Sequence, residues 1–150
     1  PGKDSLDNKV GVLTFNIQDL PHSLVASILS CEGAVGVRNG CFCAHPYVKG
    51  LLKFDEADAK AVTAEILGGN RTNLPGMVRA SFGCYNNTDD IDRLAEMLHV
   101  AARKEYKGRY RLDAASGSYW PEGFHYPLRD YFPFLSFTEA TVSDTYTGKS

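Results

Sequence analysis

Two cysteines, an arginine and a histidine that could take part in catalysis lie close together in residues 38–46. The thiolate is the reactive form of cysteine, and a neighbouring arginine or protonated histidine lowers the pKa of a thiol. A loop that holds Cys41 or Cys43 near Arg38 and His45 would therefore provide a nucleophile. The alternative is that these small side chains pack in the core, as free cysteines often do.

Metal binding is a second hypothesis for the same segment. Cys41, Cys43 and His45 could supply three zinc ligands, and Cys31 or Cys84 could supply a fourth. However, Cys-x-Cys-x-His differs from the usual ligand spacing of structural zinc sites. We therefore predict no metal site here, and a metal-binding or interaction module stays the alternative from another functional class.

Arg79 is a third candidate, because it lies in a β-rich segment between Val78 and Ala80. A half-buried arginine is rare unless it is paired, and its planar guanidinium can bind a carboxylate through two hydrogen bonds. The sequence thus indicates either a binding site for a carboxylate ligand or an ordinary ion pair with one of the acidic residues of the chain.

A run of basic and aromatic residues from Arg103 to Arg111 has the composition of grooves that bind single-stranded nucleic acid. Cations also favour the C-terminal end of a helix, which is the simpler explanation. The net charge of -2 and the pI near 6.1 give no electrostatic reason for binding to nucleic acid or to an anionic membrane. The sequence also lacks an apolar run of the roughly 18–20 residues that a membrane span needs. We therefore expect neither partner.

The elements that would position these residues are three strands and two main helices. Alternating or β-rich residues predict strands at about 10–17, 34–38 and 77–84, and apolar residues at helical spacing predict helices at about 21–32 and 87–104. The second strand would end at the loop of the two thiols, and the third would contain the candidate arginine. This pattern predicts an α+β fold in which helices pack on a small, largely antiparallel sheet.

Two of the expected helices have clear local signals. Residues 56–67 have high helix propensity and are followed by Gly68-Gly69. Asn87 is a favourable N-cap, and Asp90 follows three residues later, as in a capping box. The apolar stripe expected on this last helix consists of Ile91, Leu94, Ala95, Leu98 and Ala102.

The composition changes at about residue 106, where aromatic residues become frequent and helical periodicity ends. Such a segment is too apolar for a solvated linker. We expect one domain, residues 1–105, and an aromatic-rich extension, residues 106–150, that packs on it.

The four cysteines are too few and too unevenly spaced for a disulfide scaffold. A reducing, cytoplasmic setting is therefore expected. Because Pro1 is not an initiator methionine, we interpret the chain as a piece of a longer protein.

Two separated motifs resemble the C-terminal signature of class V pyridoxal-phosphate enzymes, especially cysteine desulfurases and selenocysteine lyases. The first is V-R-x-G, two residues and then C-A-x-P, and it stands here as Val37 to Pro46. The second is V-R-A-S, three residues, Y-N and then I-D-R-L, and it stands here between Val78 and Leu94. The resemblance covers about residues 9–100.

The resemblance implies roles for several of these residues. Cys43 occupies the position of the nucleophile that takes sulfur from cofactor-bound cysteine and becomes a persulfide. Arg79 occupies the position of the arginine that holds the substrate α-carboxylate. Arg38 resembles a second arginine close to the nucleophile and the substrate, and His45 would support the same loop.

The sequence departs from the family pattern at two positions. Where the family usually has two histidines between the glycine and the cysteine, this chain has Cys41 and Phe42. The resulting Arg-x-Gly-Cys-Phe-Cys is similar to molybdenum-cofactor sulfurases, so Cys41 is retained as an alternative nucleophile. The helix at 56–67 and the aromatic extension also have no counterpart in the small desulfurases.

The resemblance further implies a cofactor and partners. Family members hold pyridoxal phosphate mainly in a large α/β domain, through a Schiff-base lysine and an aspartate at the ring nitrogen. We therefore expect the small C-terminal domain of a larger fold-type I enzyme, a homodimer, that cleaves the C–S or C–Se bond of an amino acid such as cysteine. Sulfur would pass to an acceptor protein, and the fragment alone would be inactive. The alternative within the family is a class V aminotransferase without sulfur transfer.

Overall fold

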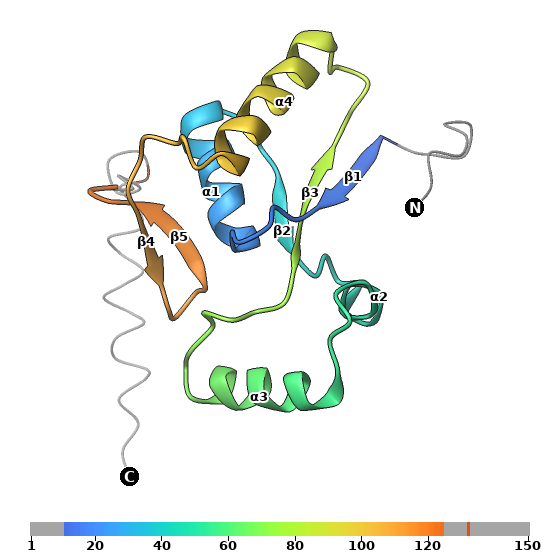
Figure 1. Ribbon diagram of the computed structural model, residues 1–150, viewed down its shortest axis with the longest axis vertical. Coiled ribbons are helices and arrows are strands. Elements are labelled where there is room, and N and C mark those ends of the chain that lie inside the picture. The colour runs from blue at the N-terminus through green and yellow to red at the C-terminus, as the bar shows by residue number, and fades with distance from the viewer. Residues whose placement is uncertain (1–10, 125–131, 133–150) are drawn as a thin grey trace.

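A small antiparallel sheet lies at the centre of the molecule (Figure 1). The computed structural model describes residues 11–124 and residue 132 of the 150-residue chain. The sheet consists of β1 (Val12–Phe15), β2 (Arg38–Gly40) and β3 (Met77–Ser81) in the order β1-β3-β2, and both pairs are antiparallel. The predicted α+β fold with a small antiparallel sheet is thus confirmed.

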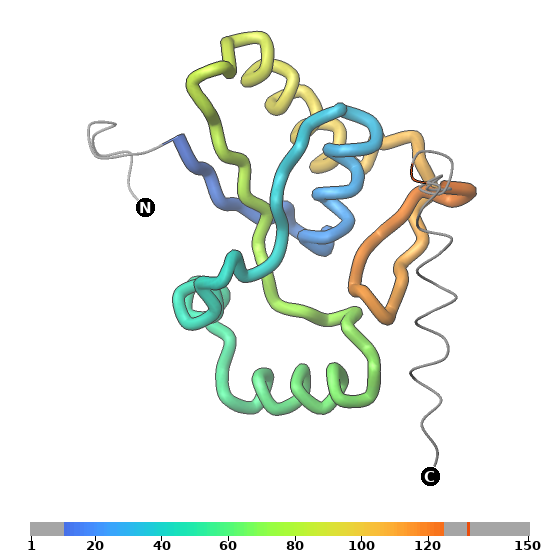
Figure 2. Tube along the Cα trace, turned by 180° about the vertical axis from the view of Figure 1, so that it is seen from behind, coloured from blue at the N-terminus to red at the C-terminus, as the bar shows by residue number. Residues whose placement is uncertain are grey.

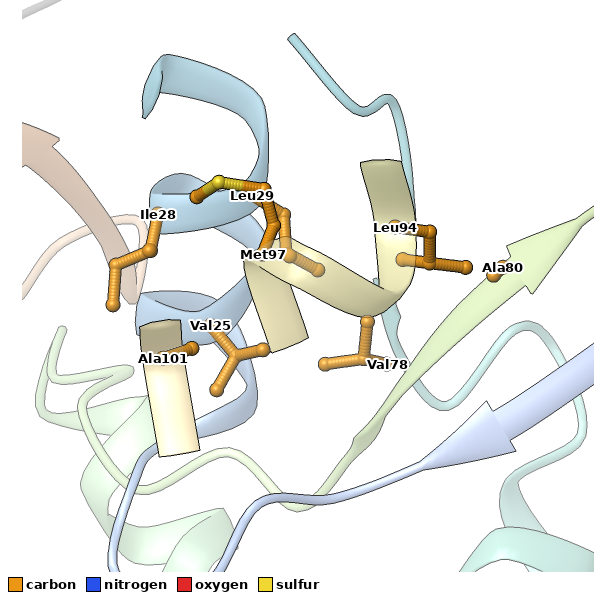
Figure 3. Close-up of a cluster of buried hydrophobic side chains, with 8 residues drawn as sticks. All are labelled: Val25, Ile28, Leu29, Val78, Ala80, Leu94, Met97 and Ala101. Atoms are coloured by element: carbon orange, nitrogen blue, oxygen red, sulfur yellow. The ribbon is translucent and has the colours of Figure 1, made fainter. Parts of the chain in front are cut away.

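Two helices, α1 (His22–Gly33) and α4 (Thr88–Ala102), cover one face of this sheet. Both lie within two residues of the predicted ranges. The core between them is drawn in Figure 3 and consists of Val25, Ile28, Leu29, Val78, Ala80, Leu94, Met97 and Ala101. Burial of a large aliphatic side chain stabilises a fold by roughly 1.5–3 kcal/mol. This cluster therefore fixes the central strand against the two helices.

The contact between α1 and α4 depends on a glycine at the end of α1. A Cβ atom on Gly33 would lie 2.7 Å from Cγ of Met97, so a larger residue there would push the two helices apart. Helix α1 ends at Gly33, and the residue that follows it, Ala34, adopts a left-handed conformation with φ 54°. Arg93 of α4 donates hydrogen bonds to the carbonyl oxygens of Glu32 and Gly33, which lack partners within the last turn of α1.

The local signals of α4 are confirmed, but its expected apolar stripe is partly wrong. Asn87 accepts hydrogen bonds from the backbone of Asp89 and Asp90, and Asp90 accepts one from the backbone of Asn87, which is the predicted capping box. The buried residues are Leu94, Met97 and Ala101, while Ile91, Ala95 and Ala102 are exposed. The helix is turned so that Met97 faces α1.

The second strand begins later than predicted. Residues 34–38 were the expected strand, but β2 starts at Arg38 and continues into the expected loop. The reason is that Ala34 and Val35 donate their backbone N–H groups to carbonyl oxygens of α1 and so complete the end of that helix. Arg38 is consequently part of the sheet ladder and not of the loop beyond it.

Two helices, α2 (His45–Leu51) and α3 (Glu56–Leu67), lie beyond one end of the sheet, as both views show (Figures 1 and 2). The bounds of α3 agree with the prediction. It begins with a capping box between Asp55 and Asp58, yet no residue of α3 is buried. Thus α3 is locally well formed but does not contribute to the main core.

The start of the aromatic-rich segment forms a hairpin, β4 (Tyr110–Asp113) and β5 (Ser118–Pro121), which the sequence analysis did not anticipate. It packs on α1, where the hydroxyl of Ser27 donates a hydrogen bond to the carbonyl oxygen of Tyr119 over 2.6 Å. Residues 125–131 and 133–150 of the expected extension lie outside the described residues, and the domain boundary at residue 105 stays a prediction.

Glu32 of α1 binds the segment that leads into this hairpin. Its carboxylate accepts hydrogen bonds from the backbone of Lys107 and Gly108 and from the hydroxyl of Tyr110. Burial alone would raise the pKa of Glu32, but these donors hold it below its usual value. Burial and the bond to Glu32 raise the pKa of Tyr110. Tyr106 and Tyr110, the aromatic residues of the basic run from Arg103 to Arg111, pack against the core and therefore contribute to the fold.

None of the helices in the described part of the chain has the length and apolar character that would let it cross a bilayer.

Candidate functional site

Arg79 lies in the central strand, on the face of the sheet opposite the core. Its partners in the ladder are Thr14 on β1 and Arg38 on β2. Residues directly opposite each other in antiparallel strands point to the same face, so these three side chains share the open face. Val78 and Ala80, which flank Arg79, are buried in the core, as the alternation of the sequence predicted.

The guanidinium of Arg79 has an unused hydrogen-bond donor. Its Nε atom is buried and has no hydrogen-bond partner in the described part of the chain. The ion pair found among the described residues joins Arg93 and Glu96, so the ordinary ion pair considered for Arg79 is not formed there. An unpaired buried donor costs roughly 1–3 kcal/mol. Within the described residues, Arg79 therefore has no carboxylate partner of its own.

Arg38 adds a second positive charge to this face. It is exposed and stands directly opposite Arg79 in the β2–β3 ladder. Like charges at such a position destabilise a sheet unless an anion lies between or above them. The pair thus forms a positively charged surface beside the loop that follows β2.

Phe42 links Arg79 to that loop. The Cζ atom of Arg79 lies 5.1 Å from the centroid of the Phe42 ring, which is a cation–π contact. Contacts of this kind contribute about 0.5–2 kcal/mol, with the larger values in desolvated places. The contact brings the guanidinium beside the residue that directly precedes Cys43.

The loop itself is a tight turn with an unusual backbone. The N–H of Ala44 donates to the carbonyl oxygen of Cys41 over 2.8 Å, and the two residues between them have positive φ, 53° at Phe42 and 62° at Cys43. Two successive positive φ values define a type I′ turn, in which glycine and asparagine are preferred. Each such residue with a bulky side chain costs on the order of 1–3 kcal/mol. Strain of this size at Cys43 is typical of functional sites.

The two thiols of this turn have different surroundings. Cys41 is half-buried, and its thiol donates to the carbonyl oxygen of Pro75 over 3.1 Å. Burial raises the pKa of Cys41, and the nearby charge of Lys49 offsets only part of this rise. Cys43 is exposed. Cys41 is therefore engaged and partly covered, whereas Cys43 is exposed to solvent.

The other residues considered in the sequence lie apart from this turn or only border it. His45 begins α2 and is exposed. Cys31 is on α1 and Cys84 is in the turn after β3, and both are exposed free thiols. Within residues 11–124 and residue 132, no three His, Cys, Asp or Glu side chains are grouped so that they could hold a metal ion. The zinc ligand set considered from the sequence is thus not assembled in the described residues.

Sequence reasoning missed the contribution of Phe42. Phe42 departs from the family pattern, and a single aromatic residue in a loop gives no signal about its partner. The same holds for His22, whose ring bridges Asn39 and the carbonyl oxygen of Leu74 at 3.2 and 3.0 Å. Both contacts join residues far apart in the sequence, so only the fold reveals them.

Comparisons with known proteins agree with the two motifs. The family model described as aminotransferase class-V matches residues 2–94. A probable cysteine desulfurase of Staphylococcus aureus strain Mu50 is 38% identical over 93 residues, which are 61% of this chain and 17% of the relative. A probable cysteine desulfurase of Halalkalibacterium halodurans is 36% identical over 101 residues, which are 67% of this chain and 19% of the relative.

The chain thus spans about a fifth of the length of the curated relatives that it matches. The match includes β1, β2 and β3 with both arginines, and the turn of the two thiols. Since the family model covers more than half of the chain, the protein belongs to the aminotransferase class-V family.

Proposed function

We propose that this chain supplies the nucleophile and the carboxylate-binding arginine of a pyridoxal-phosphate enzyme that cleaves the C–S bond of cysteine or a similar amino acid. The observation that carries the proposal is the contact between Arg79 and Phe42. It joins the guanidinium of Arg79 to the strained turn whose next residue is Cys43, an exposed thiol.

The residues present fit the substrate end of such a site. The guanidinium of Arg79 forms no ion pair within the described residues, and Arg38 adds charge beside it on the open face. The lysines of the described residues lie on α2 and α3 and in irregular segments, so none is on a strand of the sheet. The Schiff-base lysine and the phosphate cradle would therefore come from the large domain of the same protein, which would hold the cofactor. When bound, pyridoxal phosphate withdraws electrons from the substrate α-carbon.

The side chains of this chain would then act in a defined order. Arg79 binds the substrate α-carboxylate through its guanidinium and so orients the amino acid. The thiolate of Cys43 attacks the substrate sulfur. The S–S bond forms as the C–S bond breaks, and the substrate β-carbon that loses the sulfur gains a proton. Cysteine and the Cys43 thiol thus become alanine and a Cys43 persulfide, without any external oxidant.

Cys41 has a different part in this proposal. Its thiol is engaged with the carbonyl oxygen of Pro75, and burial raises its pKa, so its thiolate forms less readily than that of an ordinary thiol. We assign the nucleophile to Cys43 for this reason. The persulfide would pass its sulfur to an acceptor protein, in a homodimeric enzyme in the reducing cytoplasm.

The test uses the longer protein that contains this chain and the cofactor domain. Purified enzyme is given cysteine, and alanine and sulfide are measured with a reductant present. Cys43→Ser should lower both products by roughly 100-fold or more, while the visible absorbance of the cofactor is unchanged. Cys41→Ser is the matched control, two residues away, and should retain most of the activity.

Other results would decide between the alternatives. If Cys43→Ser retains full activity, the assignment of the nucleophile is wrong. Transfer of the amino group to an oxo acid without alanine or sulfide from cysteine would indicate a class V aminotransferase. Stoichiometric zinc in protein purified without chelator would favour a metal-binding module.

A further inference from the structure

A cavity of about 300 Å³ lies between α2, α3 and the turn of the β4–β5 hairpin. Neither Arg38 nor Arg79 lines it, whereas Asn39 and Gly40 of β2 and Cys41, the first residue of the strained turn, do. Ligand pockets in proteins begin at about this size. Part of its wall comes from α3 and the hairpin, segments without a counterpart in the small desulfurases.

One wall of the cavity is apolar. Ala59, Val62 and Ile66 follow one another at helical spacing and so share one face of α3. This face does not pack into the core, because no residue of α3 is buried. The apolar face of α3 is thus directed at a cavity, where it can contact a ligand.

Another wall is formed by α2 and carries the positive charge of Lys49. His45 and Lys49 are four residues apart on α2 and therefore lie on the same side of this helix. The ammonium of Lys49 lies 5.5 Å from the centroid of the Phe54 ring and forms no ion pair within the described residues. None of the described residues that line the cavity is an aspartate or a glutamate.

Several polar groups of the cavity are already engaged. Both ring nitrogens of His22 have partners, and the hydroxyl of Thr63 donates to the carbonyl oxygen of Ala59. By contrast, the side chains of His45 and Ser118 form no hydrogen bond within the described part of the chain. The free side-chain donors of the cavity therefore include Lys49 and His45 on α2, the amide nitrogen of Asn39 on β2 and the hydroxyl of Ser118 on the hairpin.

We propose that this cavity binds a small organic anion with an apolar body. The anionic group is held by Lys49 and His45, and the apolar body packs on Val62 and Ile66. A charge-assisted hydrogen bond at the anionic end and removal of apolar surface from water at the other end supply the affinity. This site goes beyond the proposed C–S lyase reaction and does not depend on it.

The test uses the 150-residue chain alone, with hexanoate as the probe and hexanamide as its uncharged equivalent. Backbone amide shifts are followed by NMR during titration. Hexanoate should give saturable shifts at Lys49, Val62 and Ile66, and hexanamide should give much weaker ones. Lys49→Met should weaken hexanoate binding roughly tenfold, whereas Lys60→Met, on an exposed part of α3 outside this cavity, should leave it unchanged.

A second variant guards against a change in folding. Val62→Asp places a carboxylate on the apolar wall and should abolish hexanoate binding while the spectrum of the remaining protein is preserved. The proposal is wrong if hexanoate gives no saturable shifts, if hexanamide binds equally well, or if Lys49→Met binds hexanoate like the unmodified chain. Since no cofactor or turnover is involved, these outcomes are independent of the desulfurase assay.

Discussion

Arg38 and Arg79 stand directly opposite each other across the β2–β3 ladder, with both side chains on the open face of the sheet. The buried Nε atom of Arg79 lacks a hydrogen-bond partner in the part of the chain that the structure describes. This arrangement does not serve the stability of the chain by itself, because it combines like charges with an unpaired donor. In the proposed function, these two arginines bind the negatively charged end of the substrate.

We predict that Arg79→Met leaves the free energy of unfolding unchanged or raises it by about 1 kcal/mol. The methionine removes the unpaired donor and the like charge, and its sulfur can still contact Phe42. Urea unfolding followed by circular dichroism measures the effect. Arg93→Met is the control, because Arg93 bonds to two carbonyl oxygens of α1, and it should cost about 1–3 kcal/mol. Equal losses for both variants would show that Arg79 is a structural residue.

The thiols of the turn should differ in their rates of alkylation. We expect iodoacetamide to modify Cys43 well before Cys41, because Cys41 is half-buried and donates to Pro75. Burial raises the pKa of Cys41, so its reaction should increase only at higher pH than that of an ordinary thiol. Mass spectrometry of the digested protein at several pH values gives both rates, and exposed Cys84 serves as the reference. Faster modification of Cys41 would show that Cys41, and not Cys43, is the more reactive thiol.

Glu32 should make the stability of the hairpin region depend on pH. Its pKa in the folded chain lies below its value in the unfolded chain, so its contribution is present above the unfolded pKa and is lost as the pH falls through the folded pKa. Glu32→Gln should lower the free energy of unfolding by about 1–3 kcal/mol at neutral pH, and this difference should shrink in acid. Denaturant unfolding of both proteins at neutral and acidic pH tests this. A difference that stays constant with pH would contradict the role assigned to the carboxylate.

The packing of α1 on α4 should be sensitive to one added methyl group. Gly33→Ala places a Cβ atom 2.7 Å from Cγ of Met97, and we expect a loss of about 1–3 kcal/mol. Gly36→Ala is the matched control, since its Cβ atom would meet nothing within 4 Å. Thermal unfolding compares the two. If Gly33→Ala is as stable as Gly36→Ala, the two helices have room to move apart at no cost.

The features that could be predicted from sequence are those with local causes. Asn87 and Asp90 are three residues apart and bond to each other's backbone, so the start of α4 could be read directly. The orientation of Arg79 followed from alternation along a single strand. Helix α3 followed from propensity within twelve residues.

The features that were missed depend on contacts between distant segments. The buried stripe of α4 is turned towards Met97 because α1 presents Gly33 there, which no pattern within α4 could indicate. The hairpin is held on α1 by Glu32 and Ser27, which lie more than 70 residues earlier in the sequence. The contact between Arg79 and Phe42 likewise joins β3 to a loop after β2. The motifs therefore identified the candidate site residues, but only the fold shows which of their side chains are engaged with other parts of the chain.

The register of β2 on β3 has a mechanical consequence. Gly40 ends β2 opposite Met77, and the turn with Cys43 follows within three residues, so the turn is anchored to the strand that bears Arg79. If the sheet rotates as a rigid body, the guanidinium of Arg79 and the thiol of Cys43 therefore move together. In the proposed reaction, one movement would then bring both Arg79 and the Cys43 thiol to the substrate, with no separate rearrangement of the loop.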